Sequence, residues 1–377
     1  MKGSWWKERS ELDDDQLSFL ELPKEGRYLL IGPPGSGKTN LLLLRAKYLH
    51  GSGMKNSLFV TLTKSLADFI RTGVTNNKYV SPESITTFRK WAWEHISTYA
   101  PHRLSEYPQQ GSYSATQPKI IELLRVANEH LPTSKLYDAI FIDEVQDLLC
   151  DELQILNSLS ENVSIAGDSR QAIYSGDALL KGELSSFVPK ELKYHYRIGH
   201  AICTVADKLL PDEPLLPRCQ YKEAKLQSTA ELFRSESRAE QAQRIATRIQ
   251  TQLKAYPGEL IGIITPKKKG LQELRDYLTG SSLSEVAYHD LDEFDNTFSS
   301  DRAVHALTIH SAKGTEFRAL HIFAAEDFKY PLHKRELLYT AVTRAKTSLS
   351  VHYTGKICAP LDSAMAKPAD PNIDDLF

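Results

Sequence analysis

The sequence predicts an α/β fold in which parallel strands are buried between layers of helices. Residues 28–31 and 139–142 are short apolar runs of strand length, and the first is followed by a glycine-rich string and an apolar helical segment. A strand that is apolar at every position is typical of a parallel sheet covered by helices on both faces. At 377 residues, the chain is long enough for two domains or for one large α/β unit.

Composition places the chain among ordinary globular proteins. Hydrophobic residues make up 41% and charged residues 25%, the balance of a chain with a packed core. The net charge of −2 gives no strongly basic surface, so any nucleic-acid site is expected to be a local groove. No apolar run reaches membrane-spanning length and residues 1–15 are too polar for a signal peptide, so we expect a cytoplasmic protein that does not contact membranes. The four cysteines form no C-x-x-C pair and are expected to be separate reduced thiols.

The string G-P-P-G-S-G-K-T follows the first predicted strand and opens a helix. Its glycines allow successive backbone N–H groups to face one concavity that suits phosphate, and the helix adds the positive end of its dipole. Lys38 is expected to reach the outer phosphates of a nucleoside triphosphate, and the Thr39 hydroxyl to hold Mg²⁺. A chance glycine turn is the alternative, but the complete string in this context favours a phosphate loop. The predicted nucleotide-binding residues of this stretch are Gly32, Pro33, Pro34, Gly35, Ser36, Gly37, Lys38, Thr39 and Asn40.

Two acidic residues follow the second apolar run directly. Asp143 and Glu144 come at the carboxyl end of this strand, where parallel sheets bind ligands. Asp143 is placed to hold Mg²⁺, and Glu144 to orient and deprotonate an attacking water. An acidic cap on the next helix is the alternative, and the preceding phosphate loop favours the functional interpretation.

Weaker signals lie at the ends of three further predicted strands. Strands are expected at 57–63 and 85–88, and a third at 162–166 leads into a loop with Gln171 and Tyr174. Hydroxyls at strand ends, with basic and aromatic residues nearby, suit contacts to phosphates and stacked bases. Taken one at a time, such residues are more often ordinary loop or core residues.

Eight segments in chain order carry a family resemblance: GPPGSGKT, VTLTKSL, TTF, IDEVQD, GDSRQAIY, LKYHYR, LTIHSAKGTEF and LLYTAVTRA. Together they resemble the UvrD/Rep family of superfamily 1 helicases, over nearly the whole chain. The resemblance implies two RecA-like P-loop NTPase domains, each a mostly parallel sheet with helices on both faces, with ATP bound between them. We expect an ATP-binding domain at 1–190 with a small polar insertion at about 92–135, a helicase domain at 191–358, and a flexible tail at 359–377.

The resemblance also implies roles for single residues in the ATP site. The predicted catalytic residues are Lys38, Asp143, Glu144, Gln171, Arg197 and Arg344, and the predicted metal ligands are Thr39 and Asp143. Gln16 would read adenine, Tyr196 would stack on it, and Glu316 would contact the ribose. Arg197 and Arg344 would reach the phosphates from the second domain, so closure of the cleft would depend on intact ATP. A solvated helix residue is the alternative for Gln16 and for Arg344.

Nucleic-acid contacts are expected at the ends of several strands. The predicted contact residues are Thr63, Thr87, Phe88, Tyr174, Thr308 and His310. Thr308 and His310 alternate along a predicted strand, so lining that strand is their alternative role. Single-stranded DNA is the expected partner, with RNA as an alternative.

Several departures from the family pattern bear on function. The residues 175–177 replace an expected arginine and a tryptophan that stacks on DNA, and His195 replaces an asparagine. Only about fifty residues separate Phe88 from Asp143, and about a hundred separate Arg197 from Thr308, so accessory subdomains are expected to be small or missing.

Two functions are therefore expected as alternatives. The first is an ATP-driven translocase or helicase on single-stranded DNA, moving 3′ to 5′ by family analogy, in DNA repair or genome defence. The second is a nucleic-acid-gated ATPase that regulates a partner, such as a nuclease or a DNA-binding protein, without processive unwinding. The acidic segment at 367–377 ends in an apolar pair, so it is either a short peptide for docking on such a partner or a frayed terminus.

Overall fold

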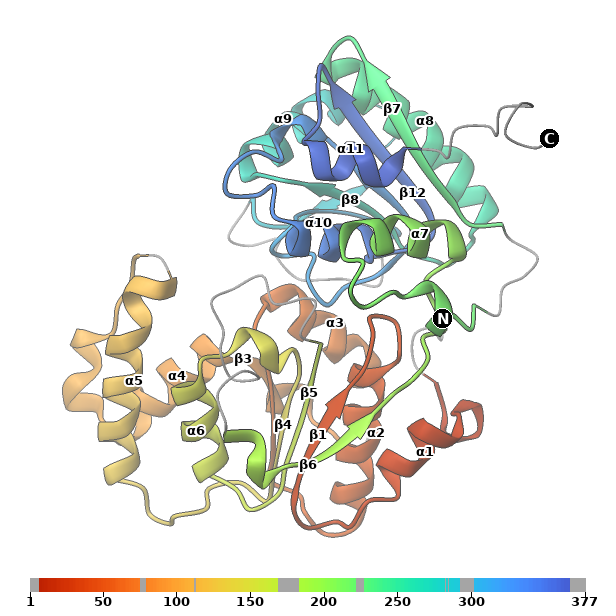
Figure 1. The fold of residues 1–377 in the computed structure, drawn as a ribbon. Coiled ribbons are helices and arrows are strands. Elements are labelled where there is room, and N and C mark those ends of the chain that lie inside the picture. Colours follow the sequence, from red (N-terminus) through yellow and green to blue (C-terminus); the bar gives the residue numbers. More distant parts are fainter. Residues whose placement is uncertain are drawn as a thin grey trace.

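Two parallel six-stranded sheets, each between layers of helices, make up the protein (Figure 1). The computed structural model describes residues 7–74, 79–111, 113–168, 183–221, 227–281, 283, 285–291 and 302–366. The fold is α/β, and its two sheets have the arrangement of two RecA-like domains, as the sequence predicts. No helix in these described segments is long and apolar enough to cross a membrane.

The N-terminal sheet has the strand order β3-β2-β4-β5-β1-β6, and all of its paired strands are parallel. Its strands are β1 (Arg27–Ile31), β2 (Ser57–Thr61), β3 (Ile85–Thr87), β4 (Ala139–Ile142), β5 (Val163–Gly167) and β6 (Val188–Glu191). Its helices are α1 (Asp14–Leu20), α2 (Lys38–Gly51), α3 (Lys64–Val74), α4 (Phe88–Tyr99), α5 (Tyr113–Glu129) and α6 (Cys150–Ser158).

Alternate residues of each strand point to opposite layers of helices. Leu58 and Ile140 pack in the core on the side of α4, α5 and α6, whereas Phe59 and Phe141 pack in the core with α2 and α3. This two-sided burial explains why the strands are apolar at consecutive positions. Because the strands are parallel, the carboxyl ends of β1 and β4 lie at the same edge of the sheet. The glycine-rich loop and the acidic residues that follow these two strands lie there as well.

The C-terminal sheet has the order β7-β12-β11-β8-β10-β9, again with parallel pairs. Its strands are β7 (Thr229–Ser235), β8 (Ile261–Thr265), β9 (Val286–Tyr288), β10 (Val304–Thr308), β11 (Phe317–Ile322) and β12 (Ala345–Thr354). Its helices are α7 (His200–Leu209), α8 (Arg238–Ala255), α9 (Lys268–Leu278), α10 (Arg335–Val342) and α11 (Ala359–Met365). α8 and α9 cover one face, and α7, α10 and α11 cover the other (Figure 1).

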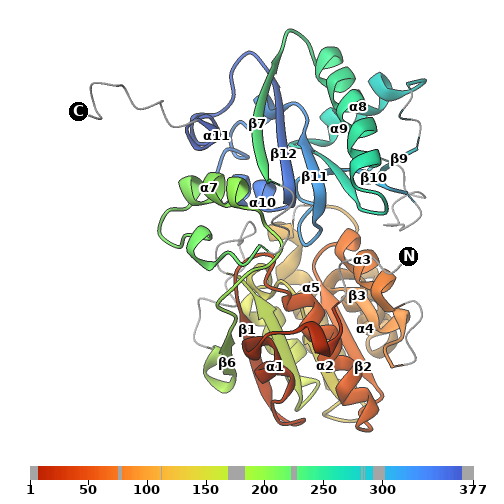
Figure 2. The same ribbon diagram turned by 90° about the vertical axis from the view of Figure 1, so that its right-hand side faces the viewer.

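The two domains meet across a continuous apolar cluster. Leu66 and Phe69 on α3 belong to the same buried cluster as Ile309 and Phe317 of the second domain. Seen from the side, α7 and α10 lie at the junction between the sheets (Figure 2). Elements that carry the functional motifs are therefore packed together from both halves of the chain.

One expectation about the fold is corrected, and one segment is described more closely. The segment at about 92–135, expected to be a small polar insertion, contains the end of α4, a 3₁₀ segment at Pro101–Glu106 and the helix α5, which packs on α4. Thr116 and Gln117 of this segment are buried although they are polar. The predicted flexible tail begins too early, since Leu361, Ala364 and Met365 of α11 are buried against the second domain. The remaining tail residues lie outside the described part of the chain.

Candidate active site

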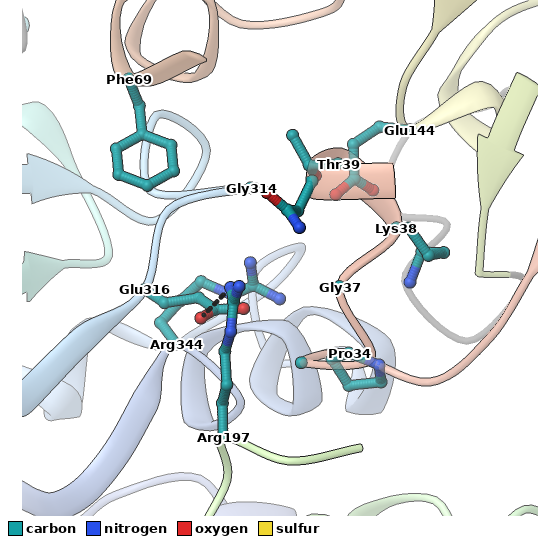
Figure 3. Close-up of a pocket in the computed structure, with 12 residues that line it drawn as sticks. Pro34, Gly37, Lys38, Thr39, Phe69, Glu144, Arg197, Gly314, Glu316 and Arg344 are labelled. Carbon is teal, nitrogen blue, oxygen red and sulfur yellow. Dashed lines mark hydrogen bonds and ion pairs between the residues drawn. The ribbon is translucent and has the colours of Figure 1, made fainter. Parts of the chain in front are cut away.

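A pocket lies between the two domains, at the carboxyl ends of β1 and β4 (Figure 3). Its lining residues are Pro34, Gly35, Gly37, Lys38, Thr39, Asn40, Phe69, Glu144, Arg197, Gly314, Glu316 and Arg344. Phe69 and Gly314 line it without having been expected from the sequence. The other ten are residues that the sequence predicted for nucleotide binding or catalysis.

The phosphate loop connects β1 to α2 and has the backbone shape that its glycines permit. Gly35 and Gly37 have φ values of 73° and 91°, in the left-handed region that other residues avoid. α2 begins at Lys38, so its first N–H groups face the pocket. The Lys38 ammonium donates to the carbonyl oxygens of Gly32 at 2.9 Å and Pro33 at 3.1 Å. A bound phosphate group would compete with these carbonyls for the buried charge.

Thr39, which lines the pocket, contacts the buried Asp143. The Thr39 hydroxyl donates to Asp143 Oδ2 at 2.6 Å, although the two residues are 104 positions apart. Burial raises the pKa of Asp143 to about 7, and the neighbouring Glu144 charge adds to the effect. A hydroxyl and a carboxylate with an unfavourable buried charge are hard oxygen donors that suit Mg²⁺. These two residues therefore fit the predicted metal ligands.

Glu144 is held in a constrained backbone conformation beside them. Its φ of 56° lies in the left-handed region, which is rare for a side chain of this size. The Gln146 side-chain amide donates to the Glu144 carboxylate, and its oxygen accepts from the Asp168 N–H at 3.1 Å. Gln146 thereby links the acidic motif after β4 to the end of β5 and orients the Glu144 carboxylate.

A lysine from the second domain reaches this acidic motif. Lys313 is almost completely buried, and its Nζ lies 2.5 Å from Asp147 Oδ2 and 4.0 Å from Glu144 Oε2. Sequence reasoning missed it, because its partners lie in the other domain. The available signal was its position in the string that also carries Gly314 and Glu316.

Glu316 and Arg197 form an ion pair on the second-domain side of the pocket (Figure 3). Arg197 Nη1 lies 3.0 Å from Glu316 Oε2. Burial alone would raise the pKa of Glu316, but the charges of Arg197, Lys346 and Arg344 hold it below its ordinary value. The glutamate is therefore a buried carboxylate that balances a cluster of cations facing the phosphate loop.

Arg344 is positioned by backbone carbonyls at the end of α10. It donates through Nε to Thr340 O at 3.0 Å and through Nη1 to Thr315 O at 3.1 Å. Its side chain is buried, so it is not the solvated helix residue that its helical context allowed. Both arginines line the pocket opposite Lys38 and Thr39.

Gln16 and Tyr196 come together at the other end of the phosphate loop. The Gln16 amide donates to Ser36 O at 2.8 Å and accepts from the Asp13 N–H at 3.2 Å. The Tyr196 hydroxyl donates to the Asp13 carboxylate, and Lys7 Nζ lies 4.7 Å from the centre of the Tyr196 ring. An aromatic ring and an amide edge at one place offer the two kinds of contact that recognise a nucleobase.

Four of the predicted nucleic-acid contacts lie at or just after strand ends. Thr63 follows β2, Thr87 ends the neighbouring β3, and Thr308 ends β10, with His310 two residues further on. All four side chains are partly exposed. Each threonine also has a local structural role, as Thr308 shows by donating to Asp290 at 3.0 Å.

Phe88 does not fit its predicted role. Its side chain is fully buried in the N-terminal core and packs on the Trp91 ring at a centroid distance of 5.5 Å. Its burial is explained by its position as the first residue of α4, under the sheet. Gln171 and Tyr174 lie outside the described residues.

The fold and the pocket define the class of protein as a P-loop ATPase built from two RecA-like domains. The AAA domain family (AAA_19) matches residues 20–177, and the UvrD-like helicase C-terminal domain family matches residues 303–351. The two matches together support a UvrD/Rep-like superfamily 1 helicase, a family of ATP-hydrolysing helicases that act on nucleic acid. A search of curated proteins finds no match.

Proposed function

We propose that the protein is an ATP-dependent translocase on single-stranded DNA that moves 3′ to 5′ and unwinds duplexes. The observation that carries the proposal is the division of the pocket between two domains. Lys38, Thr39 and Glu144 come from the first, and Arg197 and Arg344 from the second. A nucleotide bound there would tie the closure of the domains to its phosphates, which is the requirement for a motor.

Binding begins with the phosphate loop. The N–H groups at the start of α2 and the Lys38 ammonium would hold the phosphates, replacing the carbonyl contacts of Lys38 to Gly32 and Pro33. Gln16 and Tyr196 would hold the base, and Glu316 the ribose. Mg²⁺ held by Thr39 and Asp143 would supply a Lewis acid for the phosphates.

Hydrolysis requires an activated water and neutralised charge. Glu144 would accept the proton of the attacking water, and Gln146 keeps its carboxylate in place. Arg197 and Arg344 would stabilise the negative charge on the transferred phosphoryl group, as fixed guanidinium forks do well. Gln171 is proposed to contact the same phosphate.

Loss of that phosphate would remove the negative charge that attracts Arg197 and Arg344 towards the phosphate loop. Lys313 contacts Asp147 and approaches Glu144, so the same interface connects the second domain to the hydrolytic carboxylate. Thr63, Thr87, Thr308 and His310 lie on both domains and are proposed to hold the DNA backbone. A change in the domain interface would therefore change the spacing of the DNA contacts.

One observation favours the alternative of a nucleic-acid-gated regulatory ATPase. In the described segments, the chain between α4 and β4 holds a 3₁₀ segment and α5, and no further domain lies beside the two sheets. A motor core without accessory domains is suited to act with a partner such as a nuclease.

Strand displacement from tailed duplexes tests the proposal. We expect ATP-dependent release of the labelled strand from a duplex with a 3′ single-stranded tail, and little from one with a 5′ tail. Release in the reverse pattern would contradict the proposed polarity. ATP hydrolysis stimulated by single-stranded DNA without any strand release would favour the regulatory ATPase.

A further inference from the structure

Three side chains with metal-binding chemistry converge at the start of the segment that carries Tyr196 and Arg197. They are His195, in the segment that follows β6, Cys203 on α7, and Cys219, just after a 3₁₀ turn at Leu216–Arg218. Their ligand atoms all lie within 4.8 Å of one another, and Cys203 Sγ is 3.8 Å from His195 Nε2. The sequence predicted separate thiols because Cys203 and Cys219 are sixteen positions apart, and α7 and the returning loop bring them together.

The backbone holds this cluster from two sides. His195 and Cys219 form a parallel bridge, in which His195 N donates to Arg218 O at 3.0 Å and Gln220 N donates to His195 O at 2.8 Å. The Asp207 carboxylate fixes the loop between the cysteines by accepting from Leu215 N at 2.6 Å. The three ligands therefore sit on a rigid framework.

Burial and polarity of the site favour a structural ligand set. His195 and Cys203 are fully buried, and Cys219 is partly exposed. Both thiols donate to the Ile198 carbonyl oxygen, Cys203 Sγ at 3.6 Å and Cys219 Sγ at 3.3 Å. The two sulfurs are therefore close together, and metal binding would replace these hydrogen bonds. His195 Nε2 is also 3.0 Å from Leu215 O, a contact that a metal at Nε2 would replace.

We propose that His195, Cys203 and Cys219 bind one thiophilic metal ion, with zinc as the closest match. Two thiolates and a neutral imidazole balance the charge of a divalent ion, and soft sulfur ligands select zinc over magnesium or calcium. Zinc–sulfur bonds of about 2.3 Å and zinc–nitrogen bonds of about 2.0–2.1 Å place sulfur and nitrogen roughly 3.5 Å apart in a tetrahedral site. The separation of 3.8 Å between Cys203 Sγ and His195 Nε2 is close to that value. Binding releases the two thiol protons, and the fourth position of the tetrahedron is left to water or another small ligand.

The position of the site gives the metal a structural role. His195 directly precedes Tyr196, whose N–H donates to Gly35 O of the phosphate loop at 3.3 Å, and Arg197, which lines the nucleotide pocket. A metal would fasten the segment that carries these residues to α7 and to the loop of Cys219. It would stabilise the fold around Arg197 without touching the nucleotide.

Metal binding by the full-length, untagged chain tests the proposal. The protein is purified under reducing conditions, its metal content is measured by mass spectrometry, and the metal-free form is titrated with Zn²⁺ or Co²⁺. We expect about one equivalent per chain, a thiolate-to-cobalt charge-transfer band, and a rise in Tm on adding Zn²⁺. Cys219→Ser is expected to weaken Zn²⁺ binding about tenfold or more.

Matched controls separate loss of a ligand from general damage. Cys358→Ser removes a thiol that is also partly exposed but lies outside the cluster, and it is expected to bind Zn²⁺ like the parent chain. Cys203 is fully buried, so Cys203→Ser alone could lose Zn²⁺ binding by misfolding. The Cys219→Ser variant therefore decides the test, and its circular dichroism and Tm show whether that variant is folded. Equal Zn²⁺ affinity of Cys219→Ser and the parent chain would overturn the proposal. So would a disulfide between Cys203 and Cys219, located by peptide mapping after mild oxidation in the presence of Zn²⁺, because thiolates held by the metal should resist that oxidation.

Discussion

Asp143, which contacts Thr39 of the pocket, carries an unfavourable buried charge. Burial and Glu144 raise its pKa from 3.8 to about 7. The folded chain without metal therefore holds this proton more tightly than the unfolded chain does. As pH rises from about 4 to about 7, the folded state loses that advantage, so the free energy of unfolding falls across this window and levels off above it.

Asp143→Asn removes the charge and should remove this pH dependence. In a chelating buffer at pH 8, we expect the variant to be more stable than the parent by roughly 1–3 kcal/mol, with the gap closing towards pH 5. Urea unfolding at several pH values measures this difference in the free energy of unfolding, with a substitution of an exposed residue, Asp212→Asn, as the control. A gap that stays constant between pH 5 and pH 8 would show that the Asp143 charge is not what the pocket opposes.

Glu144→Gln tests the proposed general base. The amide keeps the shape and the proximity to Gln146 but cannot accept a proton from water, so turnover should fall about 10²–10⁴-fold. ATP affinity should be almost unchanged, as measured with a fluorescent analogue. The exposed Glu129→Gln is the matched control. A variant that hydrolyses ATP at the normal rate would remove Glu144 from the mechanism.

At the scale of elements, α3 and the turn before β11 form a close contact between the domains. Gly314 lies in this turn with φ of 80°, and a Cβ placed there would lie 2.4 Å from Leu66 Cδ2 on α3. The turn carries Lys313 and Glu316, so a wedge here would shift both relative to the phosphate loop. A shift of about 1 Å in groups that contact the reacting atoms is enough to lower the rate roughly a hundredfold.

Gly314→Ala is therefore expected to lower ATP turnover about tenfold or more while the chain remains folded. Gly280→Ala is the matched control, because its φ of 77° imposes the same backbone strain and its Cβ would meet nothing within 4 Å. Adding Leu66→Ala to Gly314→Ala should restore part of the turnover by making room for the methyl group. If both glycine variants lose turnover equally, backbone strain and not the α3 contact is responsible.

At the scale of the whole molecule, the parts that local sequence determines were predictable. The phosphate loop and the acidic residues after β4 follow from strand, turn and helix patterns within a dozen residues each. The family resemblance then led to Arg197, Glu316 and Arg344, which line the pocket from the second domain. Their roles in hydrolysis remain predictions.

The parts that depend on distant packing were not predictable. Lys313 finds Asp147 across the domain interface, and nothing in the residues around either one indicates the pair. Cys203 and His195 meet only because α7 folds back beside the segment after β6. Phe88 is an aromatic residue just after a strand, which suits a base contact, but at the start of α4 its side chain is buried in the core.

The most direct test of the central claim is the rate of ATP hydrolysis with and without single-stranded DNA. A motor whose site is divided between two domains should hydrolyse ATP slowly alone and several-fold faster or more when DNA draws the domains together. Arg344→Ala should abolish the stimulated rate, because the second domain would then bring one fewer cation to the phosphates. An equal rate with and without DNA would contradict the claim that this site drives movement on nucleic acid.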